Sequence, residues 1–386
     1  MLPQPKLFFP NLDGLRFFAF FAVFINHAMG CLGYSNNHPE FNFIKKHFLM
    51  NGDLGVSFFF VLSGFLITYL LLQEKEASKK INIKYFYMRR VLRIWPLYFF
   101  IVFLCLAVLP LFSAALPPHF PIGVNTHKLN PWFYLTFTGN FDYLYHGISN
   151  VLIGVLWSVS VEEQFYLFWP LIVAFIPNKY LLPTFLSIIL GSVAFRFFYA
   201  NGNVMIIKYH SLSSISDLAT GAVIAYLSMK ENFTERIKQI PKYIIVGVYC
   251  IGFILIPFRF YTWKFAFYYA HVAAVVPILL SAFFAFIILE QNYAEHSFYK
   301  ISRSKYISSL GKYTYGMYCY HIIVFFLVIY SFYLVGINIV GMNKYTFIGI
   351  TSISFFLTIV LSKFSYHKFE LSFLNMKNNF TQKNIE

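Results

Sequence analysis

Apolar runs, most of them about 17 to 24 residues long, recur along the 386-residue chain. A helix rises about 1.5 Å per residue, so runs of this length match the roughly 30 Å of hydrocarbon in a bilayer. They lack the two-residue alternation that is typical of barrel strands. The runs lie at residues 15–33, 54–73, 94–114, 156–176, 179–200, 211–229, 243–257, 267–289, 313–336 and 345–362. The sequence therefore predicts an all-α, polytopic membrane helix bundle of about ten transmembrane helices.

The composition excludes other classes of protein. With 59% hydrophobic and 12% charged residues, the chain is too apolar for a soluble domain. Its formal net charge of +15 could suggest a nucleic-acid partner. The basic residues, however, form short clusters between the apolar runs, where orientation in the membrane accounts for them. We therefore expect the lipid bilayer as a partner and no nucleic acid.

The connections between the runs differ in positive charge. Of the 30 Lys and Arg residues, 22 fall on the side that holds both termini and 7 on the opposite side, while Arg196 lies within a run. Lys and Arg concentrate in the short cytoplasmic loops of membrane proteins. We therefore predict a multi-pass protein with both termini in the cytoplasm.

We expect one membrane domain over residues 1–370 and a short cytoplasmic tail over residues 371–386. The N-terminus lacks a basic leader and a small-residue cleavage site, so we predict that the first run is kept as a span. Segment 115–155 is broken by several prolines and is predicted to be an extracytoplasmic loop. Whether it dips into the membrane around residues 132–137 stays open, since irregular backbone at that depth needs surrounding protein or water.

The cysteines give no sign of a metal centre. The chain has four, widely separated, in or beside apolar runs: Cys31, Cys105, Cys250 and Cys319. Their spacing does not match that of zinc sites. We expect reduced packing residues and no metal.

The first run carries two ionisable groups, Arg16 and His27. Eleven residues of helix come within about 20° of whole turns, so both side chains should lie on one face, roughly 16 Å apart along the axis. Ionisable groups in the bilayer are costly, which makes a functional role the default hypothesis. Asp13 lies close to the same face and is expected to be either a helix N-cap or a member of the site.

Three arginines mark the cytoplasmic start of the third run. Arg89, Arg90 and Arg93 occur in YFYMRRVLRIWPLYFF. They either orient the helix in the membrane or form an anion clamp, because the planar guanidinium group suits phosphate.

Two glutamates, Glu162 and Glu163, are predicted near the outer part of a run, flanked by Trp157 and Tyr166. Adjacent residues cannot share a helix face, so at least one carboxylate should point into the bundle. We interpret the aromatic neighbours as interfacial anchors, with a sugar-stacking surface as the alternative.

Asp217 and His321 also lie within runs, with Gly221 one turn after Asp217 and His321 in the cytoplasmic half of its run. Each is expected to be either a satisfied polar residue or a member of the site. Ser63 and Gly64 in FFFVLSGFLI are typical of a helix-packing notch.

Two mechanisms suit this arrangement of charges. In a proton-coupled transporter, intramembrane Asp, Glu and His residues pass protons or bind substrate. In a transferase, a charged donor from the cytoplasm meets an acceptor at the outer face. Internal repeats would favour the transporter, and we find none in the sequence.

Five stretches, in order, resemble the membrane-bound acyltransferase 3 family, the O-acetyltransferases of cell-envelope and exported glycans. They are LDGLRFFAFFAVFINHA, FFFVLSGFLIT, YMRRVLRIWPLY, LWSVSVEEQFYLFWP and GKYTYGMYCYHI. Together they cover nearly the whole chain. The family's usual ten-helix membrane domain agrees with the number of runs.

The resemblance implies transfer of an acyl group, most often acetyl, from cytoplasmic acetyl-CoA to a hydroxyl of a glycan such as lipopolysaccharide, at the bacterial cytoplasmic (inner) membrane. Arg16 and His27 match the motif regarded as essential in the family. Arg90 and Arg93 match its donor-side pair, and Glu162 matches the acidic position that follows Trp157 and Ser158. No stretch resembles the family's optional extracytoplasmic esterase-like domain, so we expect the membrane domain, alone or with a partner, to complete the transfer.

The resulting hypothesis connects the two ends of the first run. The CoA phosphates would be held by arginines, namely Arg89, Arg90, Arg93 and Arg16. The pantetheine arm would follow a single track to His27, the general base, which Glu162 would orient. A covalent acyl-enzyme, the identity of the acceptor and the oligomeric state stay open.

Overall fold

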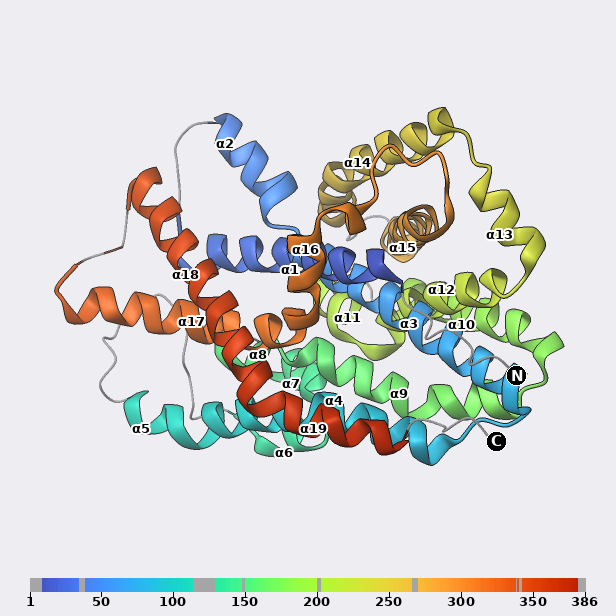
Figure 1. Ribbon diagram of the computed structural model, residues 1–386. Coiled ribbons are helices and arrows are strands. Elements are labelled where there is room, and N and C mark those ends of the chain that lie inside the picture. Colours follow the sequence, from blue (N-terminus) through green and yellow to red (C-terminus); the bar gives the residue numbers. More distant parts are fainter. Residues whose placement is uncertain are drawn as a thin grey trace.

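A computed structural model of the protein describes residues 9–34, 39–113, 129–147, 150–199, 203–265, 270–337, 339 and 342–380. These residues form a bundle in which most of the long helices run from left to right across Figure 1. The elements assigned within them are all helical. The predicted all-α bundle is therefore confirmed.

The first half of the chain contains five long helices. These are α1 (Pro10–Cys31), α3 (Gly52–Ser78), α4 (Ile83–Phe103), α9 (Trp157–Phe175) and α10 (Asn178–Tyr199). Shorter helices connect them: α2 (Pro39–Ile44), α5 (Leu109–Ser113), α6 (Pro131–Leu135), α7 (Gly139–His146) and α8 (Val151–Gly154).

The second half contributes five more long helices. These are α12 (Ser211–Ser228), α14 (Lys242–Phe265), α15 (Ala270–Tyr293), α17 (Thr314–Leu334) and α18 (Lys344–Ser365). The shorter ones are α11 (Val204–Tyr209), α13 (Glu231–Lys238), α16 (Lys305–Leu310) and α19 (Leu371–Met376). Single π-helical or 3₁₀ turns occupy Lys45–Leu49, Leu104–Val108, Ile301–Arg303, Gly311–Tyr313, Tyr366–Glu370 and Lys377–Phe380.

Each of the ten predicted runs coincides with one of the long helices. Within the described residues, eight helical segments are long and apolar enough to cross a membrane. A ninth, Val204–Ser228, qualifies together with α13, which bends away from it by 99°. The remaining run corresponds to the shorter apolar stretch Lys242–Pro257 of α14.

Helix α4 begins eleven residues before the predicted start of its run at residue 94. The side chain of Asn82 caps it by accepting a hydrogen bond from the backbone N–H of Tyr85 at 3.0 Å. The three arginines of this region consequently lie in the body of a helix, where its other faces meet neighbouring helices. This displacement brings two of them to the site described below.

Segment 115–155 is more ordered than a surface loop where the structure describes it. It forms the short helices α6, α7 and α8, and its polar residues Asn140, Asp142 and Asn150 are buried. Tyr98 of α4 donates a hydrogen bond to the carbonyl of Tyr134 at 2.8 Å. Protein therefore surrounds this irregular backbone, as a re-entrant segment would require. Residues 114–128 and 148–149 lie outside the described residues, and the depth of the segment in a membrane stays a prediction.

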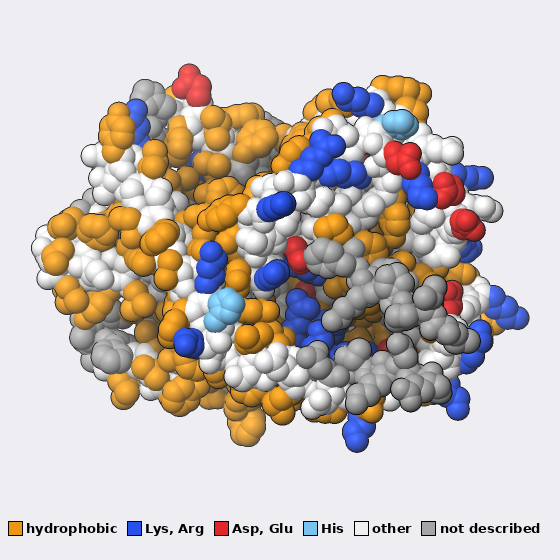
Figure 2. Space-filling view, in the orientation of Figure 1, with side chains coloured by type: hydrophobic (Ala, Val, Ile, Leu, Met, Phe, Trp, Pro, Cys, Tyr) orange, Lys and Arg blue, Asp and Glu red, His pale blue; other side chains and the backbone are white. Residues whose placement is uncertain are grey.

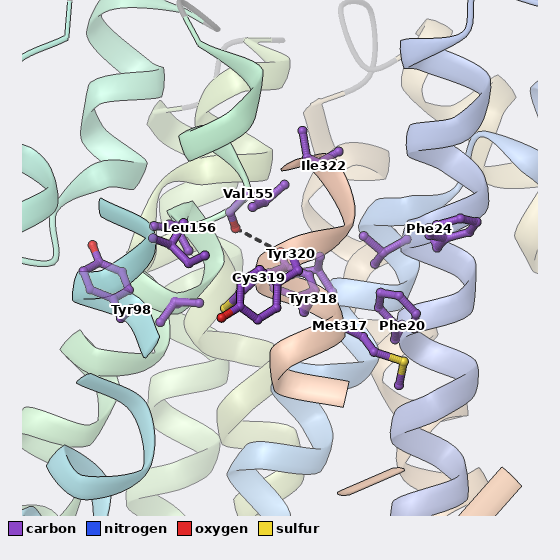
Figure 3. Close-up of a cluster of buried hydrophobic side chains, with 14 of the residues drawn as sticks. Phe20, Phe24, Tyr98, Val155, Leu156, Met317, Tyr318, Cys319, Tyr320 and Ile322 are labelled. Carbon is purple, nitrogen blue, oxygen red and sulfur yellow. Dashed lines mark hydrogen bonds between the residues drawn. The ribbon is translucent and has the colours of Figure 1, made fainter. Parts of the chain in front are cut away.

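The centre of the bundle is built on α17. Figure 3 shows its side chains between those of α1 on one side and those of α4 and the α8–α9 connection on the other. Tyr318 of α17 donates a hydrogen bond to the carbonyl of Val155 at 3.1 Å. Cys31, Cys105 and Cys319 are buried and Cys250 is exposed, and all four are free thiols, as predicted.

Helices α3 and α12 approach so closely that only glycine fits at two positions. A Cβ atom on Gly64 would overlap the backbone carbonyl of Leu218, and one on Gly221 would overlap the backbone of Val61. Small residues permit such backbone contact between membrane helices. The predicted packing notch is confirmed at Gly64, and it fixes α12 against the middle of α3.

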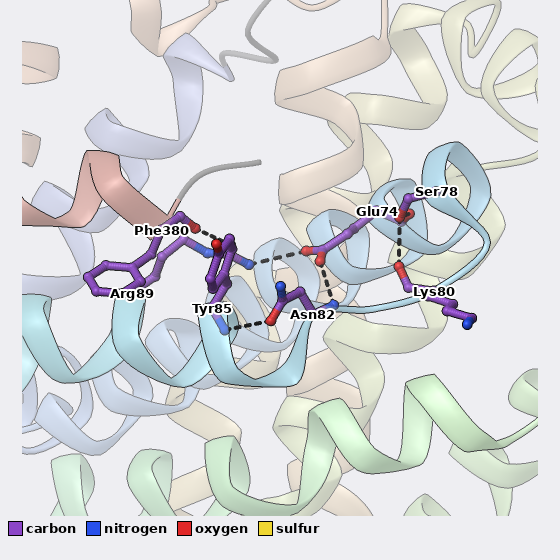
Figure 4. Close-up of polar contacts among 7 residues, drawn as sticks. All are labelled: Glu74, Ser78, Lys80, Asn82, Tyr85, Arg89 and Phe380. Atoms are coloured by element: carbon purple, nitrogen blue, oxygen red, sulfur yellow. Dashed lines mark hydrogen bonds and ion pairs between the residues drawn. The ribbon is translucent and has the colours of Figure 1, made fainter. Parts of the chain in front are cut away.

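The C-terminal part of the described chain is a helix that packs on α4. Helix α18 continues through a π-helical turn into α19, and residues 377–380 follow as a 3₁₀ turn. Arg89 donates a hydrogen bond from Nη1 to the carbonyl of Phe380 at 2.9 Å, as Figure 4 shows. The region that we predicted as a tail therefore begins with ordered, packed structure.

Positive side chains gather at one end of the helices. Figure 2 shows Lys and Arg mainly over the centre and right of this face, and hydrophobic side chains over the left. Helix α1 begins, and α19 ends, towards the right-hand side of Figure 1. This arrangement agrees with the uneven charge of the connections, and the cytoplasmic location of that end stays a prediction.

The contact between α3 and α12 leads to a prediction about stability. We expect Gly64→Ala to lower the free energy of unfolding by about 2 kcal/mol or more, because the added methyl group meets backbone that cannot rotate away. The matched control is Gly191→Ala in α10, where a Cβ atom meets nothing within 4 Å. The measurement is thermal unfolding in detergent, followed by size-exclusion chromatography. Equal stability of the two variants would contradict the packing described here.

Candidate active site

Two cavities lie inside the bundle. The first, here named the arginine cavity, is lined by residues of α1, α3, α4, α9 and α17. They are Arg16, Val56, Phe59, Phe60, Leu62, Ser63, Leu66, Ile67, Arg90, Arg93, Ile94, Ser158, Val159, Glu162, Tyr166, Thr314, Tyr315 and Tyr318. Three guanidinium groups and one carboxylate therefore share a mostly apolar wall.

Arg16 reaches this cavity from the first turns of α1. Its Nη1 forms an ion pair with Asp13 Oδ1 at 2.5 Å. The N-cap position of α1 is Phe9, with no side-chain cap, so Asp13 does not cap the helix. The structure thus places Asp13 beside the site, where it offsets the charge of Arg16.

Arg90 and Arg93 retain unused hydrogen-bonding capacity. Neither forms a hydrogen bond or ion pair with another residue in the described part of the chain, and Nε of Arg90 is buried without a partner. The guanidinium of Arg90 instead lies 5.7 Å from the ring centroids of Phe86 and Tyr166. Two such cations inside a bundle are suited to an anionic ligand.

Arg89 does not belong to this cavity. Its Nη2 forms an ion pair with Glu74 of α3 at 3.2 Å, and the carbonyl of Phe380 accepts from its Nη1 (Figure 4). The expectation that Arg89 completes an anion clamp is therefore wrong. Although Arg89 lies one helical turn before Arg93, its guanidinium is held by Glu74 and Phe380 and does not line the cavity.

Glu162 lies with the arginines and not apart from them. Its Oε2 accepts a hydrogen bond from Tyr166 at 3.0 Å, and the hydroxyls of Tyr166 and Ser63 are 2.5 Å apart. We expected the arginines towards the cytoplasmic side of the membrane and the carboxylates towards the outer side. This expectation is wrong for Glu162, because the early start of α4 brings Arg90 and Arg93 level with this part of α9. Tyr166 is buried within the bundle, so its interpretation as an interfacial anchor is also wrong.

Glu163 points away from its neighbour, as adjacent helix positions require. Its Oε2 accepts a hydrogen bond from Trp95 Nε1 at 2.9 Å, and it does not line the arginine cavity. Ser158 does line it, and its hydroxyl lies 2.7 Å from that of Tyr318. Sequence reasoning missed Tyr318, because nothing in its immediate sequence distinguishes it from the other tyrosines of α17.

His27 faces the second cavity, here named the histidine cavity. Its lining comes from α1, α3, α9, α10, α11, α12, α15 and α17, together with Met50, which precedes α3. The residues are Val23, Asn26, His27, Met50, Gly52, Asp53, Leu54, Val56, Ser57, Phe60, Trp157, Arg196, Ile207, Lys208, Tyr209, Ser213, Ser214, Asp217, Val276, Pro277, Leu280 and Tyr318.

Arg16 and His27 consequently face different cavities, and the expectation of one continuous track is wrong. The two cavities share a wall made of Val56, Phe60 and Tyr318, which line both. The helical spacing did place both side chains towards the interior of the bundle. It could not reveal that side chains from α3 and α17 insert between them.

The ring of His27 contacts a second histidine. His27 Nδ1 lies 2.8 Å from Nε2 of His321, a residue 294 positions away, and His321 Nδ1 lies 2.7 Å from the carbonyl oxygen of Tyr318. His321 lies in the first half of α17, the half that we predict to be nearer the cytoplasm. The expectation that Glu162 orients His27 is wrong, because Glu162 lines the other cavity.

Charged and aromatic residues surround the rest of the histidine cavity. Arg196 is 1% exposed and donates hydrogen bonds to Ser192, Ser213, Ser216 and Ala274, while its Nη2 has no partner among the described residues. Asp217 accepts from Ser281 at 2.5 Å, and Lys208 lies 3.7 Å from Asp53.

Two aromatic rings form one corner of this cavity. The rings of Trp157 and Tyr209 meet edge to face with centroids 4.8 Å apart. The sequence marked Asp217 as a candidate and offered a sugar-stacking role for Trp157 only as the alternative to an interfacial anchor, and it missed Tyr209, Asp53 and Lys208. For Arg196 a signal existed, since it is a guanidinium within an apolar run.

No cluster of three or more His, Cys, Asp or Glu side chains that could hold a metal ion occurs among the described residues. The residues that line the two cavities offer guanidinium groups, carboxylates, hydroxyls and an imidazole. Such a set can bind an anion on one side of the shared wall and accept a proton on the other.

Comparisons with known proteins agree with this architecture. A family model described as an acyltransferase domain matches residues 9–366. The O-acetyltransferase OatA of Staphylococcus aureus strain NCTC 8325 / PS 47 is 28% identical over 255 residues, which cover 64% of this chain and 38% of the relative. OatA of strain COL gives the same values. No solved structure matches the chain.

The chain spans less than half the length of these curated relatives. The family model, in contrast, extends over almost all of the residues that form the bundle and includes both cavities. The chain therefore belongs to the acyltransferase 3 family, the family that its sequence motifs resemble.

Proposed function

We propose that this protein transfers an acyl group, acetyl in the first instance, from cytoplasmic acyl-CoA to a hydroxyl of a cell-envelope or exported glycan. One observation carries the proposal: an arginine-rich cavity and a histidine-containing cavity meet at the wall of Val56, Phe60 and Tyr318. A reaction between a charged donor and a separately bound acceptor needs such a pair of compartments.

The arginine cavity is the proposed site of the donor. CoA carries several phosphate charges, and Arg90 and Arg93 have no carboxylate within ion-pair distance in the described residues. Arg16 adds a third cation, partly offset by Asp13. Arg16 and Thr314, which line it, lie near the starts of α1 and α17, the helix ends that the distribution of Lys and Arg predicts to be cytoplasmic.

The histidine cavity is the proposed site of the acceptor. Its lining carries two cations, Arg196 and Lys208, and two carboxylates, Asp53 and Asp217, so it favours an uncharged group over a strongly anionic one. Hydrogen-bonding groups of both kinds and the rings of Trp157 and Tyr209 suit a sugar. The helix ends around it belong to the predicted extracytoplasmic side.

His27 is the proposed general base. The acceptor oxygen attacks the carbonyl carbon of the thioester while its proton passes to His27. The carbon–sulfur bond then breaks, and the CoA thiolate takes up the proton from the imidazolium. Imidazole suits both steps, because its ordinary pKa lies near neutrality.

The cellular setting follows from the chemistry. Because the proposed donor is made in the cytoplasm and the proposed acceptor lies in the envelope, we propose the cytoplasmic membrane of a bacterium as the location. Acceptors of the required kind include lipopolysaccharide, exopolysaccharide, peptidoglycan and lipid-linked glycans. The names of the S. aureus relatives support O-acetyl transfer.

The decisive experiment combines two measurements. Purified protein is tested for release of CoA from acetyl-CoA, and envelope glycans of cells with and without the protein are compared by mass spectrometry. Acyl transfer predicts CoA release together with a mass increase of one acyl group per modified sugar. A transporter would move a substrate without consuming the thioester, and that outcome would overturn the proposal.

Loss of an arginine should weaken binding of the donor. We expect Arg90→Gln and Arg93→Gln each to raise the Kd for CoA about 10- to 100-fold, since a hydrogen bond to a charged group contributes about 1.5–3 kcal/mol. Arg89→Gln is the matched control, because Arg89 faces Glu74. Isothermal titration with CoA measures the effect. A similar loss in all three variants would contradict the assignment of this cavity.

Loss of the base should affect the reaction and not donor binding. We expect His27→Ala to lower kcat about 10²- to 10⁴-fold, the usual contribution of general base catalysis, with the Kd for CoA unchanged because His27 lies outside the arginine cavity. Initial rates of CoA release measure this change. Retention of full activity would remove His27 from the mechanism.

Loss of a carboxylate in the histidine cavity should affect the acceptor alone. We expect Asp217→Asn to reduce the acyl ester content of envelope glycans several-fold, because the side chain no longer accepts hydrogen bonds with both oxygens. The Kd for CoA of the purified variant should equal that of the parent. A variant that weakens CoA binding instead would show that this cavity serves the donor.

A further inference from the structure

The contact between His27 and His321 determines where the protons of the two rings lie. A backbone carbonyl oxygen can only accept a hydrogen bond. Because the Tyr318 carbonyl is 2.7 Å from His321 Nδ1, this nitrogen must carry a proton. In a neutral ring the other nitrogen, Nε2, is then an acceptor.

The protonation of His321 also determines that of His27. His321 Nε2, as an acceptor, requires a proton on His27 Nδ1, which is 2.8 Å away. The neutral His27 ring therefore has its lone pair on Nε2. This nitrogen has no partner in the described part of the chain, while the residue lines the histidine cavity.

His321 itself is sealed from both cavities. Its side chain is fully buried, and it lines neither cavity. Three aromatic rings enclose it, with centroids 5.8 Å away for Phe20, 6.4 Å for Phe24 and 5.8 Å for Tyr318. A substrate cannot reach this ring, so His321 can act only through His27.

We propose that His321 is a positioning residue that, held by the Tyr318 carbonyl, fixes the tautomer and orientation of His27 and presents the Nε2 lone pair to the acceptor hydroxyl. This inference rests on the proposed role of His27 as the base. In a catalytic triad a carboxylate orients the base by a hydrogen bond. Here the imidazole of His321 and the carbonyl of Tyr318 take the place of that carboxylate.

As a partner of His27, neutral His321 differs from a carboxylate in its charge. A carboxylate partner would stabilise the imidazolium by its negative charge, whereas neutral His321 supplies a dipole alone. The proton gained by Nε2 is therefore held weakly and passes readily to the leaving thiolate. Selection of the tautomer is the main contribution that we assign to His321.

The test compares two substitutions at this position. In His321→Leu the acceptor is lost, and we expect kcat to fall about 10²-fold or more, with the Kd for CoA unchanged. In His321→Gln the side-chain oxygen can accept from His27 Nδ1, and we expect kcat within about 10-fold of the parent. Tyr320→Phe is the control on the same helix, since it removes a buried hydrogen bond to Ser365 that is remote from His27.

A spectroscopic readout separates positioning from a structural role. Nitrogen-15 NMR of histidine-labelled protein, with His27→Ala used to identify the signals of His27, reports which ring nitrogen carries the proton. We expect the Nδ1–H form in the parent and in His321→Gln, and a mixture of both tautomers in His321→Leu. An Nε2–H form in the parent would overturn the proposal.

The activities also distinguish the positioning role of His321 from the role of His27 as the base. If His27→Ala abolishes activity and His321→Leu keeps kcat within 10-fold, the positioning role is refuted while the base survives. If His27→Ala remains active, the proposed function of His27 fails. In the double variant we expect no loss beyond that of His27→Ala, because residues that act as a unit are not additive.

Discussion

A guanidinium group inside a membrane bundle needs polar partners or a ligand, and the arginines that line the two cavities meet this need in different ways. Arg196 is surrounded by serine and carbonyl oxygens, and Arg16 is paired with Asp13. Arg90 and Arg93 have neither kind of partner in the described structure. The proposed assignment of donor and acceptor to the two cavities depends on that difference.

The sequence was sufficient for the class of fold and for most of the helices. Apolar length identifies spans because the bilayer imposes it, and the helices coincide with the predicted runs. Prediction from the sequence was less reliable at the ends of helices. The run predicted to begin at residue 94 belongs to α4, which begins at Ile83 after its N-cap Asn82. The first turns of α4 are polar, so a search for apolar runs does not detect them.

The site was predicted in parts, and the relations between the parts were not. Arg16, Arg90, Glu162 and Ser158 do share one cavity, but His27 lies beyond a wall that the spacing on α1 cannot reveal. The partner of His27 comes from 294 residues away. Periodicity describes one helix at a time, whereas such contacts depend on how helices rotate and slide against one another.

The wall shared by the two cavities has a consequence for the cell. Val56, Phe60 and Tyr318 are all buried, and two of the three side chains are purely hydrocarbon. Under the proposed function the two cavities face opposite sides of the membrane, and a water-filled pore between them would dissipate ion gradients. An apolar partition between the two cavities would let the proposed acyl transfer connect two compartments while the protein remains electrically insulating.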